Sequence, residues 1–163
     1  LIAKKRSFLR RVHELLRTKE GIAKTYSALV AGQWPGFTQI NDPLHTWVRS
    51  GGERMTRVAP DGKPSLTRFR LERQGSLMAL LSAMPVTGRT HQIRVHAAGA
   101  GCPVAGDDKY GNPETNLELR KSGINRMMLH ASRLELNLPE VGYNLDVQAP
   151  PEARMQRALD RLA

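Results

Sequence analysis

The chain has 163 residues, with 25 lysines and arginines against 15 aspartates and glutamates, and a formal net charge of +10. Its length favours one domain, at roughly 100–200 residues per domain, and its 40% of apolar residues excludes a long disordered chain. No run of about 18 apolar residues is present, which argues against a membrane span. A membrane surface is a poor partner, because the basic helix candidate over Ser7–Lys19 has a mixed polar face and no Trp or Tyr anchor. The single cysteine, Cys102, cannot form an internal disulfide and favours a reducing, cytosolic setting.

The positive charge is concentrated in two segments. Residues 1–24 carry a net charge of +6 and residues 49–73 a net charge of +4, whereas residues 134–163 carry −2. Concentrated positive charge favours a polyanion, because each neutralised phosphate releases counterions. A merely solubilising surface is the alternative interpretation.

The first half of the chain predicts one helix followed by strands. Ser7 is placed to cap a helix that runs to about Lys19, with Gly21 ending it. Residues 26–30 read as a strand, and residues 33–63 as loops with short strands, because Gly, Pro, Asn and Asp are frequent there.

The second half predicts an antiparallel sheet with two further helices. Residues 66–71 and 77–84 form strand candidates around a Gln74-Gly75 turn. Thr90 is placed to cap a helix that runs to about Ala98. Residues 127–138 and 145–147 predict further strands, and Pro150-Pro151 precedes a last helix. Together the elements indicate an α+β fold with a mostly antiparallel sheet flanked by helices, in one domain over residues 1–163.

The most informative stretch runs from Thr87 to His96. Gly88 lets the backbone turn sharply before the expected helix and exposes free N–H groups. His91 and Arg94 are three residues apart and share a helix face. The stretch therefore predicts an anion or nucleotide site, with a structural basic helix as the alternative.

Two other kinds of site are weighed and rejected. His91 and His96 are five residues apart, about 140° around a helix, which is unsuitable for two zinc ligands on one face. Asp107 and Asp108 could in principle form a carboxylate pair. Their glycine-flanked context, however, predicts a structural turn.

These motifs together resemble the RluA-type pseudouridine synthases, in particular the branch that modifies large-subunit ribosomal RNA. The resemblance implies conversion of uridine to pseudouridine, with no cofactor and no metal, by part of a catalytic domain. It covers essentially the whole chain in the family's order. The matching segments are residues 24–26, 88–96, 101–104, 107–111 and 129–131.

One family motif does not occur in this sequence. The family carries a His-Arg-Leu-Asp-x-x-Thr-Ser-Gly segment with the catalytic aspartate, just before a strand that ends in a pattern like residues 1–5. The chain is accordingly expected to be the C-terminal portion of a synthase, with the catalytic aspartate and any S4-type RNA-binding domain upstream of Leu1. Alone, it is expected to be inactive.

The resemblance assigns supporting roles to residues that are present. Arg94 occupies the position of the cation beside the catalytic carboxylate, Tyr26 that of the pocket tyrosine, and Leu129 that of an apolar pocket residue. A phosphate contact or a surface salt bridge for Arg94 and plain core roles for the other two are the alternatives. Expected RNA-binding residues are Arg89, His91, Lys4, Lys5 and Arg6.

Three other functions remain open from the residues. A related synthase could act on other ribosomal sites or on transfer RNA. A non-catalytic RNA-binding module and a basic structural protein of the ribosome would also explain the charge.

Overall fold

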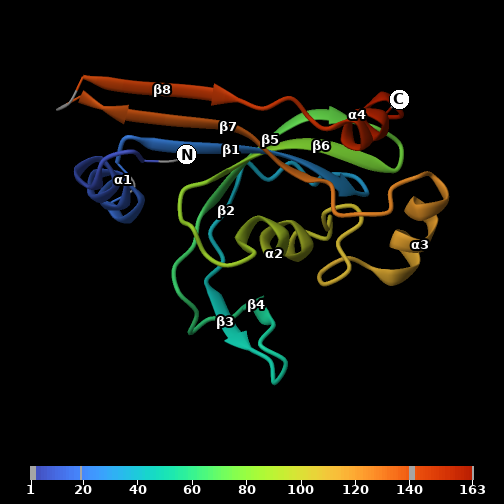
Figure 1. Ribbon diagram of the computed structural model, residues 1–163. Coiled ribbons are helices and arrows are strands. Elements are labelled where there is room, and N and C mark those ends of the chain that lie inside the picture. The colour runs from blue at the N-terminus through green and yellow to red at the C-terminus, as the bar shows by residue number, and fades with distance from the viewer. Residues whose placement is uncertain (1–2, 19, 140–141, 163) are drawn as a thin grey trace.

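The computed structural model describes residues 3–18, 20–139 and 142–162, and its centre is a six-stranded sheet (Figure 1). The strand order is β2-β5-β6-β1-β7-β8, and every neighbouring pair is antiparallel. The sheet and its helices confirm the predicted α+β fold. The strands are β1 (Ile22–Ala31), β2 (Gln39–Ile40), β5 (Thr67–Gln74), β6 (Met78–Pro85), β7 (Leu129–Leu138) and β8 (Tyr143–Gln148).

Helices cover both faces of this sheet, because the central strand β1 is apolar on both sides. Ala28 and Val30 belong to the core cluster that includes residues of α2, whereas Leu29 belongs to the cluster that includes residues of α4. Helix α1 packs through Val12 and Leu15 against the outer part of β7. The helices are α1 (Arg6–Thr18), α2 (Gln92–Gly99), α3 (Pro113–Lys121) and α4 (Ala153–Asp160).

A two-stranded hairpin, β3 (Leu44–Val48) and β4 (Arg54–Val58), stands apart from the main sheet and beyond α2 (Figure 1). Backbone hydrogen bonds of 2.9 and 2.8 Å between Leu44 and Lys63 close the base of this excursion. Gly62 is required there, since a Cβ atom would lie 2.6 Å from the Leu44 carbonyl carbon. The hairpin therefore has a fixed attachment next to the start of α2.

Both helix caps expected from the sequence are wrong. Helix α1 begins at Arg6, so Ser7 lies inside its first turn. The expected helix end at Lys19 lies outside the described residues. Leu1 and Ile2, which belong to the strand end expected from the family pattern, also lie outside them. Helix α2 begins at Gln92, one residue later than a Thr90 cap would start it, and its N-cap is His91. The preceding His91 adopts a left-handed conformation with φ 53°, which interrupts the helix despite the capping residue before it.

Helix α3 was not predicted from the sequence, whereas the expected strands are present. Asn112 caps α3 by accepting a 3.0 Å hydrogen bond from the Thr115 N–H, and Pro113 occupies its first position. The sequence Asn-Pro signals a turn as readily as a helix start. Strand β1 is longer than the predicted 26–30, while β7 begins two residues after the predicted start.

A buried polar network joins α2 to β5. Thr67 Oγ1 accepts a 2.9 Å hydrogen bond from Gln92 Nε2 and lies 2.8 Å from His96 Nδ1. The Thr67 hydroxyl can therefore donate its proton to Nδ1. His96 Nε2 then carries its hydrogen and donates it to the Asp42 carbonyl oxygen, 3.1 Å away. His96 is fully buried, and this burial disfavours the charged form of its imidazole ring.

Stability is expected to fall as the pH drops below about 6.5. Burial lowers the pKa of His96, so the unfolded chain binds the proton first. The stabilisation is complete above the ordinary histidine pKa and is lost as the pH falls towards the folded one. Urea unfolding at pH 7.5 and 5.5 should show a larger loss for the natural chain than for His96→Gln. Equal losses would contradict this origin.

Candidate active site

The main candidate site is a cavity of about 410 Å³ on the α2 side of the sheet. It lies between β1, β7 and the turn that leads into α2, and it brings together five residues proposed from the sequence. Lys24, Ile93 and Met127 also line it and were not assigned a site role from the sequence. The five expected residues are Tyr26, Arg89, His91, Arg94 and Leu129.

The lining of this cavity is strongly basic. Lys24, Arg89 and Arg94 contribute to it, and no aspartate or glutamate is among its lining residues. Apolar side chains from α2 and β7 form other parts of the wall. A site with several cations, apolar walls and no acid favours an anionic ligand that carries a flat, partly apolar group.

Arg94 is held from behind by a buried carboxylate. Its Nε and Nη2 atoms each donate a 2.7 Å hydrogen bond to Asp107, and its guanidinium carbon lies 4.8 Å from the centre of the Tyr110 ring. The side chains are 13% exposed for Arg94 and fully buried for Asp107. Burial opposes ionisation of Asp107, but the hydrogen bonds and charge of Arg94 outweigh it, so the pKa of Asp107 is lowered.

This fixed orientation leaves one edge of the guanidinium available. Within the described part of the chain, Nη1 of Arg94 has no hydrogen-bond partner, and Arg94 lines the cavity. A planar guanidinium can serve two acceptors on different edges. Asp107 therefore positions Arg94, and the remaining N–H groups can meet a second anion from the cavity side.

Asp107 and Asp108 do not form a carboxylate pair. Asp107 accepts hydrogen bonds from the Lys109 and Tyr110 N–H groups, so the predicted turn is present, but its bond to Arg94 was missed. Asp108 is 75% exposed and pairs with Arg120 on α3. Thirteen residues separate Arg94 from Asp107, and no local pattern in the sequence links them.

His91 is linked to the hairpin through Tyr110. The Tyr110 hydroxyl accepts a 3.0 Å hydrogen bond from the Thr56 N–H and lies 2.7 Å from His91 Nδ1. The hydroxyl can donate its own proton to Nδ1, which leaves Nε2 as the N–H of a neutral ring. Burial lowers the pKa of His91, and the positive charges of Arg94 and Lys109 lower it further.

Gln92 holds the glycine turn that borders the cavity. Its Oε1 accepts hydrogen bonds from the Thr87 hydroxyl at 2.5 Å and from the Arg89 N–H at 3.0 Å. The Arg89 side chain in turn donates two 3.1 Å hydrogen bonds to the Pro64 carbonyl oxygen. The turn and its arginine are thus fixed to the segment that follows the hairpin.

Tyr26 lies at an irregularity of the central strand. The register between β1 and β7 shifts between Thr25 and Tyr26, a feature that commonly re-aims side chains near sites. Tyr26 is half-buried, and its hydroxyl has no hydrogen-bond partner within the described residues. Its ring therefore borders the cavity and offers a free hydroxyl group there, whereas Leu129 contributes only an apolar surface.

The basic residues at the start of α1 are not part of this cavity. Lys4, Lys5 and Arg6 are exposed and line none of the site. Their assignment to RNA binding remains a prediction.

The two histidines weighed as metal ligands have separate environments. His96 is in the α2 core network and His91 borders the cavity. In the described ranges, no three His, Cys, Asp or Glu side chains are arranged to hold a metal.

Comparison with known proteins agrees with the family resemblance noted in the sequence. Residues 1–99 match the family model described as RNA pseudouridylate synthase. Ribosomal large subunit pseudouridine synthase C is 45% identical in Escherichia coli K12 over 99% of this chain and 51% of that protein. The Yersinia pestis protein of the same name is 45% identical over 98% of this chain and 50% of that protein. The chain therefore spans about half the length of these relatives.

Two human structures share the fold. RNA Pseudouridylate Synthase Domain Containing 1 aligns with a TM-score of 0.74 and 25% identity, over 91% of this chain and 62% of that one. RNA Pseudouridylate Synthase Domain Containing 4 aligns with a TM-score of 0.75 and 23% identity, over 97% and 68%. The family match includes β1 with Tyr26 and the turn and helix that carry Arg89, His91 and Arg94. On these grounds the chain belongs to the RNA pseudouridylate synthase family.

Proposed function

We propose that this chain forms part of an enzyme that isomerises specific uridines of large-subunit ribosomal RNA to pseudouridine. The observation that carries the proposal is the cavity itself, in which an aromatic ring, apolar walls and an oriented arginine meet without any acid in the lining. The names of the relatives supply the class of RNA. No helix in the described ranges is both long and apolar enough to span a membrane, and we propose a cytoplasmic location beside the ribosome.

The reaction needs little beyond positioning and a carboxylate. The bond between ribose C1′ and uracil N1 breaks, the base turns, and a C1′–C5 bond forms while C5 loses a proton and N1 gains one. The atoms balance without a cofactor. The target uridine must first leave its stack to reach the cavity.

Each cavity residue has a role in this scheme. The Tyr26 ring stacks on the uracil, and Leu129 excludes water so that charge interactions strengthen. Arg94 presents Nη1 to the catalytic carboxylate, for which no family-like segment exists within these 163 residues. Arg89 binds a phosphate of the RNA backbone, and His91 Nε2–H donates to a carbonyl or hydroxyl oxygen of the bound nucleotide.

A non-catalytic RNA-binding module is the second candidate. The observation in its favour is that the cavity is lined by Lys24, Arg89 and Arg94 and by no aspartate or glutamate. Such a module would use the same basic cavity to hold RNA without changing it.

A hybrid protein separates the two candidates. In it, this chain replaces the matching segment of the Escherichia coli K12 relative, and pseudouridine is mapped chemically on unmodified large-subunit RNA. The hybrid should form pseudouridine, while the 163-residue chain alone and the relative without the segment should not. A folded hybrid that binds RNA but leaves every uridine unchanged would favour the binding module. Turnover by the chain alone would refute the expected external carboxylate.

A further inference from the structure

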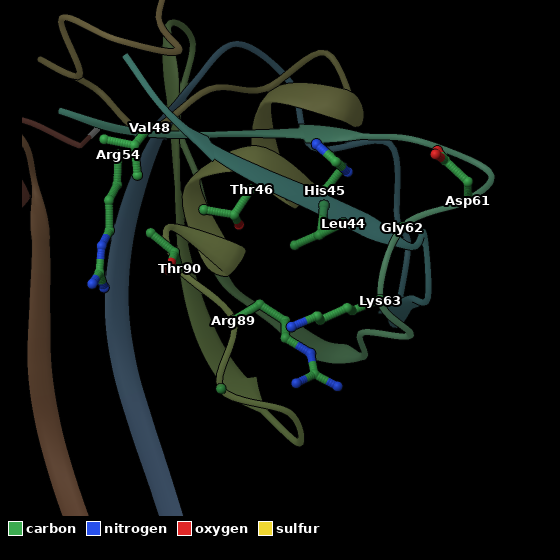
Figure 2. A pocket seen from close by; sticks show the side chains of 11 residues that line it. Leu44, His45, Thr46, Val48, Arg54, Asp61, Gly62, Lys63, Arg89 and Thr90 are labelled. Carbon is green, nitrogen blue, oxygen red and sulfur yellow. The ribbon is translucent and has the colours of Figure 1, made fainter. Parts of the chain in front are cut away.

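A second cavity, of about 450 Å³, adjoins the candidate active site (Figure 2). It lies between the β3–β4 hairpin, residues 61–63 and the turn before α2. Gly88 and Arg89 line both cavities, so this turn forms the ridge between them. Gly88 has no atom within 4 Å of the position that a Cβ would take. The ridge is therefore low and open at that residue.

Cationic side chains from three separate segments line this second cavity. Arg54 comes from β4, Lys63 from the base of the hairpin, and Arg89 from the ridge. Among the described residues none of the three has a carboxylate within 4.0 Å. Asp61 is the one acid in the lining, and Figure 2 shows its carboxylate well apart from all three.

Hydrogen bonds anchor two of these cations to neighbouring positions of the chain, Pro64 and Lys63. Arg89 donates twice to the Pro64 carbonyl oxygen, so its guanidinium lies beside the residue next to Lys63. The Lys63 backbone is in turn paired with Leu44. Figure 2 shows both side chains directed to the same part of the cavity. Neighbouring cations without a paired carboxylate favour an anionic ligand, because an anion between them offsets their repulsion.

We propose that this second cavity binds the phosphodiester of the nucleotide next to the target uridine. This inference rests on the proposed function, because it assumes that the uridine occupies the first cavity. The RNA strand crosses the ridge at Gly88, and its phosphate is bound by Lys63 and Arg89, with Arg54 on the other side. Arg89 thus contacts the strand where it passes from one cavity to the other.

The test uses the 163-residue chain and a fluorescent single-stranded RNA heptamer with one central uridine. In one set of probes, single phosphates are replaced in turn by uncharged methylphosphonates. Lys63→Met should weaken binding of the unmodified probe about threefold to tenfold and reduce the salt slope by about 0.7, the value for one contact on a single strand. Lys121→Met, on the exposed surface of α3, is the matched control and should change neither quantity.

The neutralised probes locate the contact. One methylphosphonate beside the central uridine should weaken binding to the natural chain and have no further effect on Lys63→Met. If Lys63→Met and a methylphosphonate weaken binding additively at every phosphate position, the inference is overturned. Binding that depends on Tyr26 but not on Lys63 would overturn it and leave the proposed function standing. No measurable binding by the natural chain at low salt would overturn the inference, whereas pseudouridine formation by the hybrid protein would still decide the proposed function.

Discussion

Replacing Arg94 with alanine in the hybrid enzyme should slow the chemical step by about two to four decades while RNA affinity changes far less. Removal of one partner from a buried ion pair costs about 3–5 kcal/mol, and each 1.4 kcal/mol corresponds to roughly tenfold in rate. Without the guanidinium, the catalytic carboxylate would have a raised pKa and no fixed position. Single-turnover rates at saturating enzyme, measured beside binding constants, test this expectation.

Arg94→Lys is the necessary companion, because alanine also leaves Asp107 buried without a cation. Lysine keeps a positive charge for Asp107 but cannot reach two acceptors in the geometry of a planar guanidinium. It should restore much of the stability and only part of the rate. A simple phosphate contact would behave differently, with weaker binding and nearly intact chemistry. Normal single-turnover rates in Arg94→Ala would end the proposed role.

Asp107→Asn should destabilise the 163-residue chain by about 3–5 kcal/mol, the largest effect on folding expected from one substitution in the site. Asparagine keeps an oxygen for the N–H groups of Lys109 and Tyr110, so the change isolates the lost charge opposite Arg94. Denaturant unfolding at pH 7 measures the difference. The neighbouring Asp108→Asn is the control, and because its pair with Arg120 is exposed it should cost at most about 1 kcal/mol.

The difference between Asp107→Asn and the natural chain should also depend on pH. The pKa of Asp107 is lowered in the fold, so its stabilisation is present above the ordinary aspartate pKa of about 3.9 and is lost as the pH falls through the folded value. Unfolding curves of the two proteins should therefore converge in strong acid. A gap that stays constant from pH 7 down to that range would show that charge is not the cause.

The strands of the sheet could be predicted from the sequence because each is specified by a short local pattern. Alternating apolar residues in 66–71 and the Gln74-Gly75 turn specify β5, β6 and their hairpin. The last helix was also predicted correctly after Pro150-Pro151, but the caps of α1 and α2 were not. His91 takes a left-handed backbone conformation, and its ring is bonded to Tyr110 nineteen residues away. Tertiary contacts of this kind override a capping preference that is worth only about 1 kcal/mol.

The sequence predicted which residues line the cavity but not the contacts that hold them in place. Arg89, His91 and Arg94 follow one another in a single motif, and the family resemblance added Tyr26 and Leu129, all of which line one cavity. The Asp107 carboxylate behind Arg94, the Thr56 N–H behind Tyr110, and the second cavity depend on contacts between segments far apart in the chain. Nothing in the spacing of those residues specifies such contacts.

The hairpin excursion leaves and re-enters the sheet at neighbouring points. Ile40 faces Thr67 in the ladder between β2 and β5, and Leu44 and Lys63 are paired just beyond them. Insertions at the tip of the hairpin, residues 49–52, can therefore change the length and charge of the excursion without shifting the register of the six-stranded sheet. The hairpin tip can therefore vary among related sequences next to the second cavity while Arg94 and its partner Asp107 keep their positions.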